Sequence, residues 1–301
     1  MKRVLIIGAS SFVGANLAVY LRNYYQVIGT YSSHPLHLDG LTHLKLEIRR
    51  GAYITELIDQ IKPDVTLYCA AITDENECAR MPGEALFVNA DAPGLFAQAV
   101  TKNRGRFIYI STSKIFSGEE GSYGETSPPA ARTIYGDTKW KGEERVSVYD
   151  NIFILRTGTL FGFGSLYHKS ILQRILSNVS KSEKLPLIDD EPRTFMSVWD
   201  FAKSVGTVID SQTNLQGTYH VGPSETHTYF SFGQAVVSVF GLNGMYVVPI
   251  SGEAFDRGNT LYRGKNLTLD CSTFHKTFVG SFSSIQASLQ ELKKAAHLGL
   301  C

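Results

Sequence analysis

The sequence predicts an α/β fold in which helices cover both faces of a doubly wound parallel sheet, with a smaller lobe toward the C-terminal end. Three observations lead to this prediction. Residues 2–24 hold a short apolar strand, a glycine turn and apolar residues at helical spacing. Strand-length apolar segments then alternate with helical segments as far as residue 155. After Arg156 this alternation is lost, which indicates a second, differently built part of the chain.

The composition is that of a large globular protein. The 301 residues are 43% apolar, enough for one large α/β unit or two fused lobes. The 29 basic and 28 acidic residues leave a net charge of +1, so we expect neither nucleic acid nor an anionic membrane as a partner. No apolar run approaches the roughly 18 to 20 residues that span a bilayer. Gly8 interrupts the short run after Arg3, so we interpret that run as a strand and not as a signal peptide.

The cysteines and histidines show no spacing that is typical of a metal site. There are four cysteines and eight histidines, with no CxxC and no HxxxH pair. We therefore expect no metal, reduced structural or surface thiols, and a reducing, cytoplasmic setting.

The loss of alternation divides the chain into two predicted regions. We expect residues 1–160 to form a dinucleotide-binding domain (Rossmann fold) that also receives residues 198–222. We expect residues 161–197 and 223–301 to form a lobe that packs over the strand ends and selects the substrate.

The glycine turn after the first strand carries the first functional prediction. Gly8 permits a tight turn, Gly14 lets the helix pack closely on the strand, and free N–H groups at the helix N-terminus receive a pyrophosphate. The usual middle glycine is Ser11 here, so an ordinary strand–helix turn stays open as the alternative. The residues predicted to bind the cofactor in this turn are Gly8, Ser10, Ser11, Phe12, Val13 and Gly14.

The end of the second strand, residues 27–31, bears on the choice of cofactor. It carries no Asp or Glu, the residue type that binds the ribose 2′-hydroxyl of NAD and repels a 2′-phosphate. Hydroxyl residues can accept that phosphate, which favours NADP (NADPH) and leaves NAD open. The predicted cofactor-binding residues here are Tyr31, Ser32 and Ser33, together with the small residues Ala70 and Ala71 after the third strand, residues 65–69.

The remaining elements follow from the spacing of apolar residues. In the first region we predict helices over residues 52–61, 84–100 and 135–148, and strands over residues 106–110 and 152–155. In the second we predict helices over residues 166–179, 199–209, 232–240 and 284–296, and strands over residues 218–221 and 246–249. Asn89 lies within the helix over residues 84–100, where it is either solvated or buried and hydrogen-bonded.

Tyr135 and Lys139 are the candidate chemical groups. They lie four residues apart at the start of a helix, so their side chains share one face. A nearby ammonium lowers the pKa of a phenol from about 10, which prepares it as a proton donor, although the same spacing also arises by chance. Thr112 follows the fourth strand in a Ser/Thr cluster, at the edge where open parallel sheets bind ligands. An ordinary Ser/Thr turn is the alternative.

Taken together, these motifs resemble the extended short-chain dehydrogenase/reductase superfamily over nearly the whole chain, and within it the dTDP-4-dehydrorhamnose reductases and their relatives. The order and spacing of seven segments carry the resemblance. They are residues 8–14 (GASSFVG), 69–71 (CAA), 88–89 (VN), 110–118 (ISTSKIFSG), 135–139 (YGDTK), 155–158 (LRTG) and 263–270 (RGKNLTLD).

The resemblance implies NAD(P)H-dependent reduction of the 4-keto carbon of a nucleotide-linked 6-deoxysugar. Tyr135 would donate the proton to the developing alkoxide. Lys139 would lower the pKa of that tyrosine and hold the nicotinamide ribose, so both residues would also belong to the cofactor site. Thr112 would hydrogen-bond the substrate oxygen, and Asn89 would belong to the cofactor-binding residues and help to order the site.

The chain departs from the family pattern where the family meets its substrate. These reductases usually follow the threonine with Asp-Tyr and often place a tryptophan after Arg-Thr-Gly, whereas this chain has Ser113, Lys114 and Thr159. Arg193 lies in a segment that is more similar to sugar epimerases, where it would bind a nucleotide phosphate or pair with an aspartate at position 189 or 190. We expect Ser113, Lys114, Thr159 and Arg193 to contact the substrate.

Two other functions stay open. One is an epimerase that holds NAD tightly; a dehydratase is disfavoured because Ser113 and Lys114 replace the acid–base pair. The other is a non-catalytic regulatory subunit of the same fold, although the intact Thr112, Tyr135 and Lys139 argue against it. The sequence also leaves open a homodimer, the nucleotide and the sugar.

Overall fold

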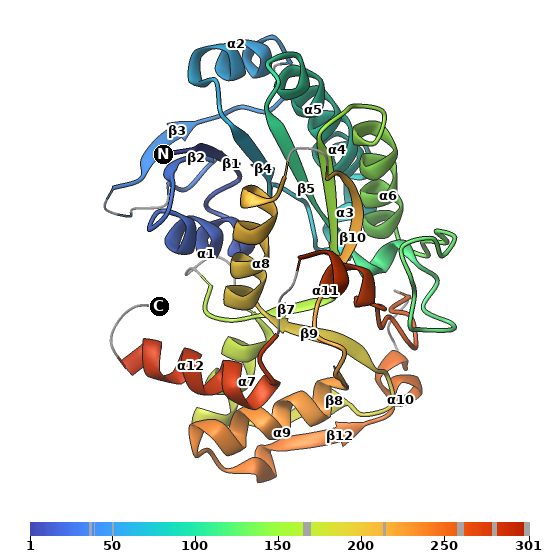
Figure 1. Cartoon of the computed structure of the whole chain (residues 1–301). Coiled ribbons are helices and arrows are strands. Elements are labelled where there is room, and N and C mark those ends of the chain that lie inside the picture. The colour runs from blue at the N-terminus through green and yellow to red at the C-terminus, as the bar shows by residue number, and fades with distance from the viewer. Residues whose placement is uncertain are drawn as a thin grey trace.

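A parallel sheet of seven strands forms the centre of the molecule. The structure is a computed structural model that describes residues 1–35, 38, 40–49, 51–164, 170–212, 215–257, 262–278 and 282–297, with the backbone alone at residues 51, 52 and 297. The strand order is β10-β6-β5-β4-β1-β2-β3, and every neighbouring pair is parallel (Figure 1). The strands are β1 (Arg3–Ile7), β2 (Gln26–Tyr31), β3 (Thr42–Lys45), β4 (Val65–Tyr68), β5 (Arg106–Thr112), β6 (Ile152–Thr157) and β10 (Gly217–Val221). The predicted doubly wound α/β fold is confirmed.

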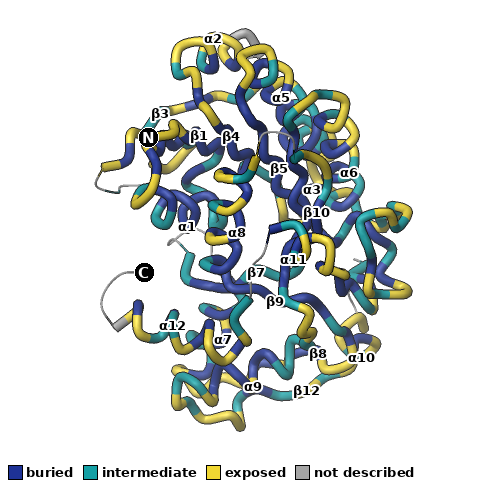
Figure 2. The backbone as a smooth tube through the Cα atoms, in the orientation of Figure 1, coloured by how far each residue is buried: buried dark blue, intermediate teal, exposed yellow. Residues whose placement is uncertain are grey.

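The sheet is covered on both faces, and β1 shows how the sequence does this. Val4 and Ile6 belong to the apolar core under α1 and α8, whereas Leu5 and Ile7 belong to the core under α2, α5 and α6. Successive residues of a strand point to opposite faces, so a strand buried on both sides must be apolar throughout. Figure 2 shows the buried sheet between exposed outer helix surfaces. The helices are α1 (Phe12–Leu21), α8 (Val198–Asp210), α2 (Gly51–Ile61), α5 (Ala92–Lys102) and α6 (Ile134–Val146).

The strand order reverses between β1 and β4. From β1 the chain builds β2 and β3 to one side, and then crosses back to build β4, β5 and β6 on the other. The crevice outside the carboxyl ends of the strands at such a reversal is where open α/β sheets bind ligands.

A smaller lobe lies beyond the carboxyl ends of the strands (Figure 1). Phe161, Phe195 and Phe232 form its aromatic centre, with the rings of Phe195 and Phe232 stacked 4.7 Å apart. Two small sheets contribute, in the orders β11-β9-β7 and β12-β8. The elements of this part are β7 (Thr159–Phe161), α7 (Ile171–Ser180), β8 (Leu185–Ile188), β9 (Arg193–Ser197), β11 (Thr226–His227), α9 (Tyr229–Phe240), β12 (Val247–Ile250), α10 (Gly252–Asp256) and α12 (Ile285–His297), while α11 (Ser272–Phe278) packs on the main sheet.

Two predicted helices differ from the observed ones. The helix predicted over residues 84–100 is divided into α4 (Pro82–Leu86), a π-helical turn η1 (Phe87–Asp91) and α5. Pro93 lacks an N–H and cannot continue a regular helical hydrogen-bond pattern, so the turn widens before it. The helix predicted over residues 166–179 begins at Ile171, where Ser170 caps it; residues 165–169 lie outside the described part.

Two further observations concern the membrane and the thiols. Within the described ranges, no helix combines the length and the apolar character needed to cross a bilayer. Cys69, Cys78 and Cys271 are buried free thiols, and Cys301 lies outside the described residues.

Candidate functional site

An elongated cleft crosses the carboxyl ends of the strands at the reversal between β1 and β4. It consists of two adjoining hollows that share Ala70 and Ala71. We call the first the turn hollow; it measures about 570 Å³ and runs from Gly8 to Ser33. We call the second the tyrosine hollow; it measures about 230 Å³ and lies between Val13 and Tyr135.

The glycine turn brings α1 unusually close to the strand ends. Gly8 has a φ of +80°, and a Cβ there would lie 2.8 Å from the Ala70 Cα. A Cβ at Gly14 would collide with the carbonyl oxygen of Gly8. Both positions therefore require glycine, as the sequence predicted for a turn that cradles a pyrophosphate.

Ser11 has a structural role at the position where a middle glycine is usual. It is the N-cap of α1, and its hydroxyl accepts a hydrogen bond from the Gly14 N–H at 3.0 Å. Its φ of −70° is ordinary for a residue with a side chain, so serine causes no backbone strain. The first turn of α1 carries no acidic residue, which leaves its positive N-terminal end available to an anion.

The turn hollow contains one basic side chain that was not predicted from the sequence. Tyr31, Ser32 and Ser33 line it as predicted, and Arg49 lines it from the segment after β3. Arg49 forms an ion pair with Glu84 of α4. The short strand β3 was not predicted, so nothing in the sequence placed Arg49 in the hollow that Ser32 and Ser33 line. Two further carboxylates, Glu47 and Glu77, line the same hollow.

Thr112, Tyr135 and Lys139 meet in the tyrosine hollow. Thr112 ends β5, while Tyr135 and Lys139 stand one turn apart on α6, whose N-cap is Thr133. The Thr112 hydroxyl hydrogen-bonds the Tyr135 phenol and favours its ionised form, but burial dominates and raises the pKa of Tyr135 to about 12. The phenol is therefore protonated at neutral pH.

The Lys139 side chain is buried, which is unfavourable for a charged ammonium group. Its Nζ donates to the Ile110 carbonyl oxygen at 2.6 Å and lies 3.8 Å from the centre of the Tyr109 ring. Burial lowers the pKa of Lys139 to about 7, and the negative charge of Glu143 opposes this shift. At neutral pH the charged and neutral forms of Lys139 are therefore present in comparable amounts. The resemblance implied that Lys139 lowers the pKa of Tyr135; in this structure the hydrogen bond from Thr112 has that effect.

Asn89 is buried behind the cleft, which settles the alternative left open by the sequence. Its Oδ1 accepts from the Ile72 N–H, and its Nδ2 donates to the Ile72 carbonyl and to the Thr138 hydroxyl, each at 3.0 Å. It lines neither hollow. Asn89 therefore joins the loop after Ala71 to α6 and orders the cleft from behind.

Comparison with known proteins identifies the family. The model of the RmlD substrate binding domain family matches residues 1–297. The chain belongs to this family. A probable low-salt glycan biosynthesis reductase of Haloferax volcanii is 30% identical over 243 residues, which cover 78% of this chain and 79% of the relative.

Two further proteins are similar to this chain over almost its whole length. Methionine adenosyltransferase 2 subunit beta of Xenopus tropicalis is 26% identical over 301 residues, which cover 96% of this chain and 86% of that protein. A crystal structure of dTDP-4-dehydrorhamnose reductase from Bacillus anthracis, in complex with NADP, superposes with a TM-score of 0.84 at 24% identity and covers 97% of this chain and 99% of that one. The chain therefore shares the fold of this crystal structure over nearly its whole length.

The four residues predicted to contact substrate in this RmlD-family chain lie in different surroundings. Ser113 is buried directly after Thr112, and Lys114 forms an ion pair with Glu75 of α3 (Glu75–Arg80). Thr159 begins β7 and is half-buried, although the tyrosine hollow is lined by its neighbours Gly158 and Leu160.

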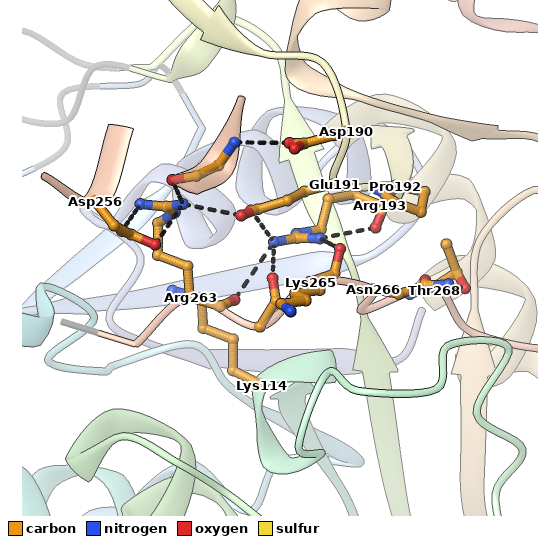
Figure 3. A network of polar contacts seen from close by, with 12 residues as sticks. Lys114, Asp190, Glu191, Pro192, Arg193, Asp256, Arg263, Lys265, Asn266 and Thr268 are labelled. Carbon is orange, nitrogen blue, oxygen red and sulfur yellow. Dashed lines mark hydrogen bonds and ion pairs between the residues drawn. The ribbon is translucent and has the colours of Figure 1, made fainter. Parts of the chain in front are cut away.

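Arg193 lies in a closed network away from both hollows. Its guanidinium pairs with Glu191 at 2.9 Å and donates to the carbonyl oxygens of Gly264 at 2.5 Å and Lys265 at 3.0 Å (Figure 3). Arg263 binds the other oxygen of Glu191, also at 2.9 Å. From the sequence, a nucleotide phosphate and a surface aspartate were the alternative partners of Arg193; its partner in the structure is the buried Glu191.

Proposed function

We propose that the chain is an NADPH-dependent reductase of a nucleotide-linked 4-keto-6-deoxysugar, with Tyr135 as the proton donor. The observation that carries the proposal is the meeting of Thr112, Tyr135 and Lys139 in a hollow that adjoins the glycine turn. Membership of the RmlD family and the similarity to a probable reductase of Haloferax volcanii support it.

The residues of the cleft fit a dinucleotide. The space that Gly8 and Gly14 leave free, with the N-terminus of α1, suits a pyrophosphate. Ala70 and Ala71 leave room for a flat group where the two hollows join. Ser32 and Ser33 would face the 2′-phosphate of NADP. A reduced nicotinamide, when bound, supplies the hydride.

The side chains of the tyrosine hollow would handle the proton. Tyr135 carries its proton at neutral pH and would release it from Oη to the substrate oxygen as negative charge develops there. Thr112, which hydrogen-bonds the phenol, would orient it and share the substrate oxygen. Lys139 would stabilise the phenolate that remains, because a positive charge nearby favours the ionised form.

On the substrate side we propose Ser113, Lys114 and Thr159 as contacts. Lys114, Arg132 and Arg263 border a small separate hollow of about 10 Å³, which Thr133, the N-cap of α6, also lines. An anionic substrate would enter between these cations and would compete with Glu75 for Lys114. A phosphate role for Arg193 would require this residue to leave its network with Glu191.

The second candidate is a subunit that partners another enzyme. The similarity to methionine adenosyltransferase 2 subunit beta, which extends over 96% of this chain, favours it. A subunit of this kind does not require Tyr135 to donate a proton, so a kinetic experiment distinguishes it from the reductase.

The test is oxidation of NADPH or NADH by the purified protein with a panel of nucleotide-linked 4-keto-6-deoxysugars, followed by nicotinamide absorbance. We expect oxidation with one panel member, and a loss of about 10²- to 10⁴-fold in Tyr135→Phe, the usual contribution of a positioned general acid. Tyr24→Phe, at a tyrosine that is 56% exposed, is the matched control and should keep full activity. Dinucleotide binding without oxidation would favour the epimerase or the subunit, and no binding at all would overturn the cofactor site.

A further inference from the structure

Glu143 is a buried carboxylate one helical turn beyond Lys139 on α6. Its side chain is 2% exposed, and it lines neither hollow, so it touches no ligand in the cleft. Arg156 holds it through two groups, with Nη2 at 2.7 Å and Nε at 3.0 Å from Oε2. The Ser111 hydroxyl donates to Oε1 at 2.5 Å. Both carboxylate oxygens are therefore fixed in place.

These contacts join the three elements that carry the tyrosine hollow. Ser111 stands on β5 directly before Thr112, and Arg156 stands on β6 directly before Thr157. Glu143 itself stands on α6, which carries Tyr135 and Lys139. One carboxylate thus sets the position of the two strand ends relative to the helix. Thr112 and Thr157 both line the hollow.

Glu143 also provides the negative charge that Lys139 otherwise lacks. The titratable groups that face Lys139 are Cys69 at the end of β4, Tyr109 on β5, and Tyr135 and Glu143 on α6, with the Arg156 cation behind Glu143. Burial raises the pKa of Cys69 to about 12 and raises that of Tyr109 well above its ordinary value, so both are neutral at pH 7. Glu143 is the one anion in this set of described groups.

We propose that Glu143 is a positioning residue of the Tyr135–Lys139 site, which keeps the Lys139 ammonium charged and holds the end of β5 that presents Thr112. The catalytic role of the Lys139 charge rests on the proposed function, whereas the electrostatic coupling between Glu143 and Lys139 does not depend on it. Arg156 and Ser111 prevent the carboxylate from swinging onto Lys139, so it acts through its charge while the ammonium stays available to a ligand.

The test measures the ionisation of Lys139 directly, in the full chain without cofactor. Protein labelled with 13C at the lysine Cε is titrated by NMR, and the Lys139 signal is assigned by its absence in Lys139→Arg. We expect one lysine midpoint far below the others, and a fall of about one pH unit or more in Glu143→Gln, because a neighbouring opposite charge moves a pKa by that amount. Asp137→Asn is the matched control on the same helix, since Asp137 is an exposed carboxylate paired with Lys141, and it should leave the midpoint unchanged.

A double variant and a pH profile distinguish a folding defect from a loss of electrostatic coupling. If Glu143→Gln folds poorly because Arg156 is left unpaired, the double variant Glu143→Gln/Arg156→Gln removes both charges, and its midpoint should still fall by a smaller amount. An unchanged Lys139 midpoint in the folded single or double variant would overturn the proposal. Where a substrate is turned over, the pH profile of kcat should move with the midpoint. A shifted midpoint in a protein that reduces no substrate would contradict the proposed function and leave the coupling standing.

Discussion

The Nζ atom of Lys139 lies 2.6 Å from the main-chain carbonyl oxygen of Ile110, inside the sheet–helix interface and without a direct carboxylate partner among the described residues. The carbonyl contact favours the ammonium, but burial outweighs it and lowers the pKa of Lys139 from 10.5 to about 7. A buried ammonium that the fold tolerates but does not need for packing is typical of a functional site.

The first prediction is that Lys139→Met stabilises the protein while it removes activity. The unfolded chain keeps the lysine proton up to its ordinary pKa, whereas the native state releases it near 7, so this residue destabilises the native state most below pH about 7. We expect the free energy of unfolding to rise by about 2 kcal/mol there, after subtraction of the lost hydrogen bond. The gain should shrink as the pH rises from 7 toward 10.5, as measured by urea unfolding across that range. A variant that is less stable than the parent at pH 6 would contradict this account.

The second prediction concerns the glycine turn. In Gly14→Ala the new Cβ would collide with the Gly8 carbonyl oxygen, and in a close-packed turn α1 must move outward. We expect dinucleotide binding to weaken more than about tenfold and the midpoint of thermal unfolding to fall by several degrees.

The matched control for the turn is Gly83→Ala, in which a Cβ meets nothing within 4 Å. Gly83 lies in α4, so alanine there should raise the free energy of unfolding by about 0.5–1 kcal/mol and leave dinucleotide binding unchanged. Calorimetry and a binding titration on both variants check the pair. Equal binding in Gly14→Ala and the parent would show that the turn does not hold the dinucleotide.

The sequence predicted most of the architecture because the central strands are apolar on both faces. Each strand of the main sheet was predicted except β3, whose four residues are exposed or half-buried and have no apolar run to reveal them. The same reasoning predicted that Thr112 lies at the ligand-binding edge of the sheet, whereas Tyr135 was identified by its spacing from Lys139 at the start of a helix. The positions of these two residues were therefore accessible without coordinates.

The charged partners of the site were not predictable in the same way. Glu143, Glu75 and Arg49 are charged residues in helices or loops, where solvated positions are the usual outcome. Only the packing of distant segments shows that Glu143 is buried against Arg156, or that Arg49 reaches the hollow lined by Ser32. Long-range pairing of this kind leaves no local pattern in the chain.

The third prediction assigns cofactor preference to Arg49. Arg49 is the one cation among the described residues that line the turn hollow with Ser32 and Ser33. We expect Arg49→Ala to weaken NADPH binding about tenfold, because one charge-assisted contact is lost. NADH binding should change less than about twofold, because NADH lacks the 2′-phosphate. Glu84→Gln frees Arg49 from its ion pair and should tighten NADPH binding instead. Fluorescence titration with both dinucleotides measures the ratio. Parallel losses for NADH and NADPH would show that Arg49 does not read the 2′-phosphate.

The fourth prediction separates a structural from a phosphate-binding role for Arg193. The guanidinium is buried, pairs with Glu191 and donates to main-chain carbonyls, so Arg193→Met leaves a buried carboxylate partly unpaired and should destabilise the protein by about 3–5 kcal/mol. Glu191 still pairs with Arg263 in this variant, so we expect a loss of unfolding free energy toward the lower end of this range. In the folded fraction dinucleotide affinity should equal that of the parent, because Arg193 lines neither hollow. Urea unfolding and a dinucleotide titration measure both effects. Unchanged stability together with a large rise in the KM for the nucleotide sugar would instead support the phosphate contact, since a residue that binds substrate and is not needed for packing affects binding alone.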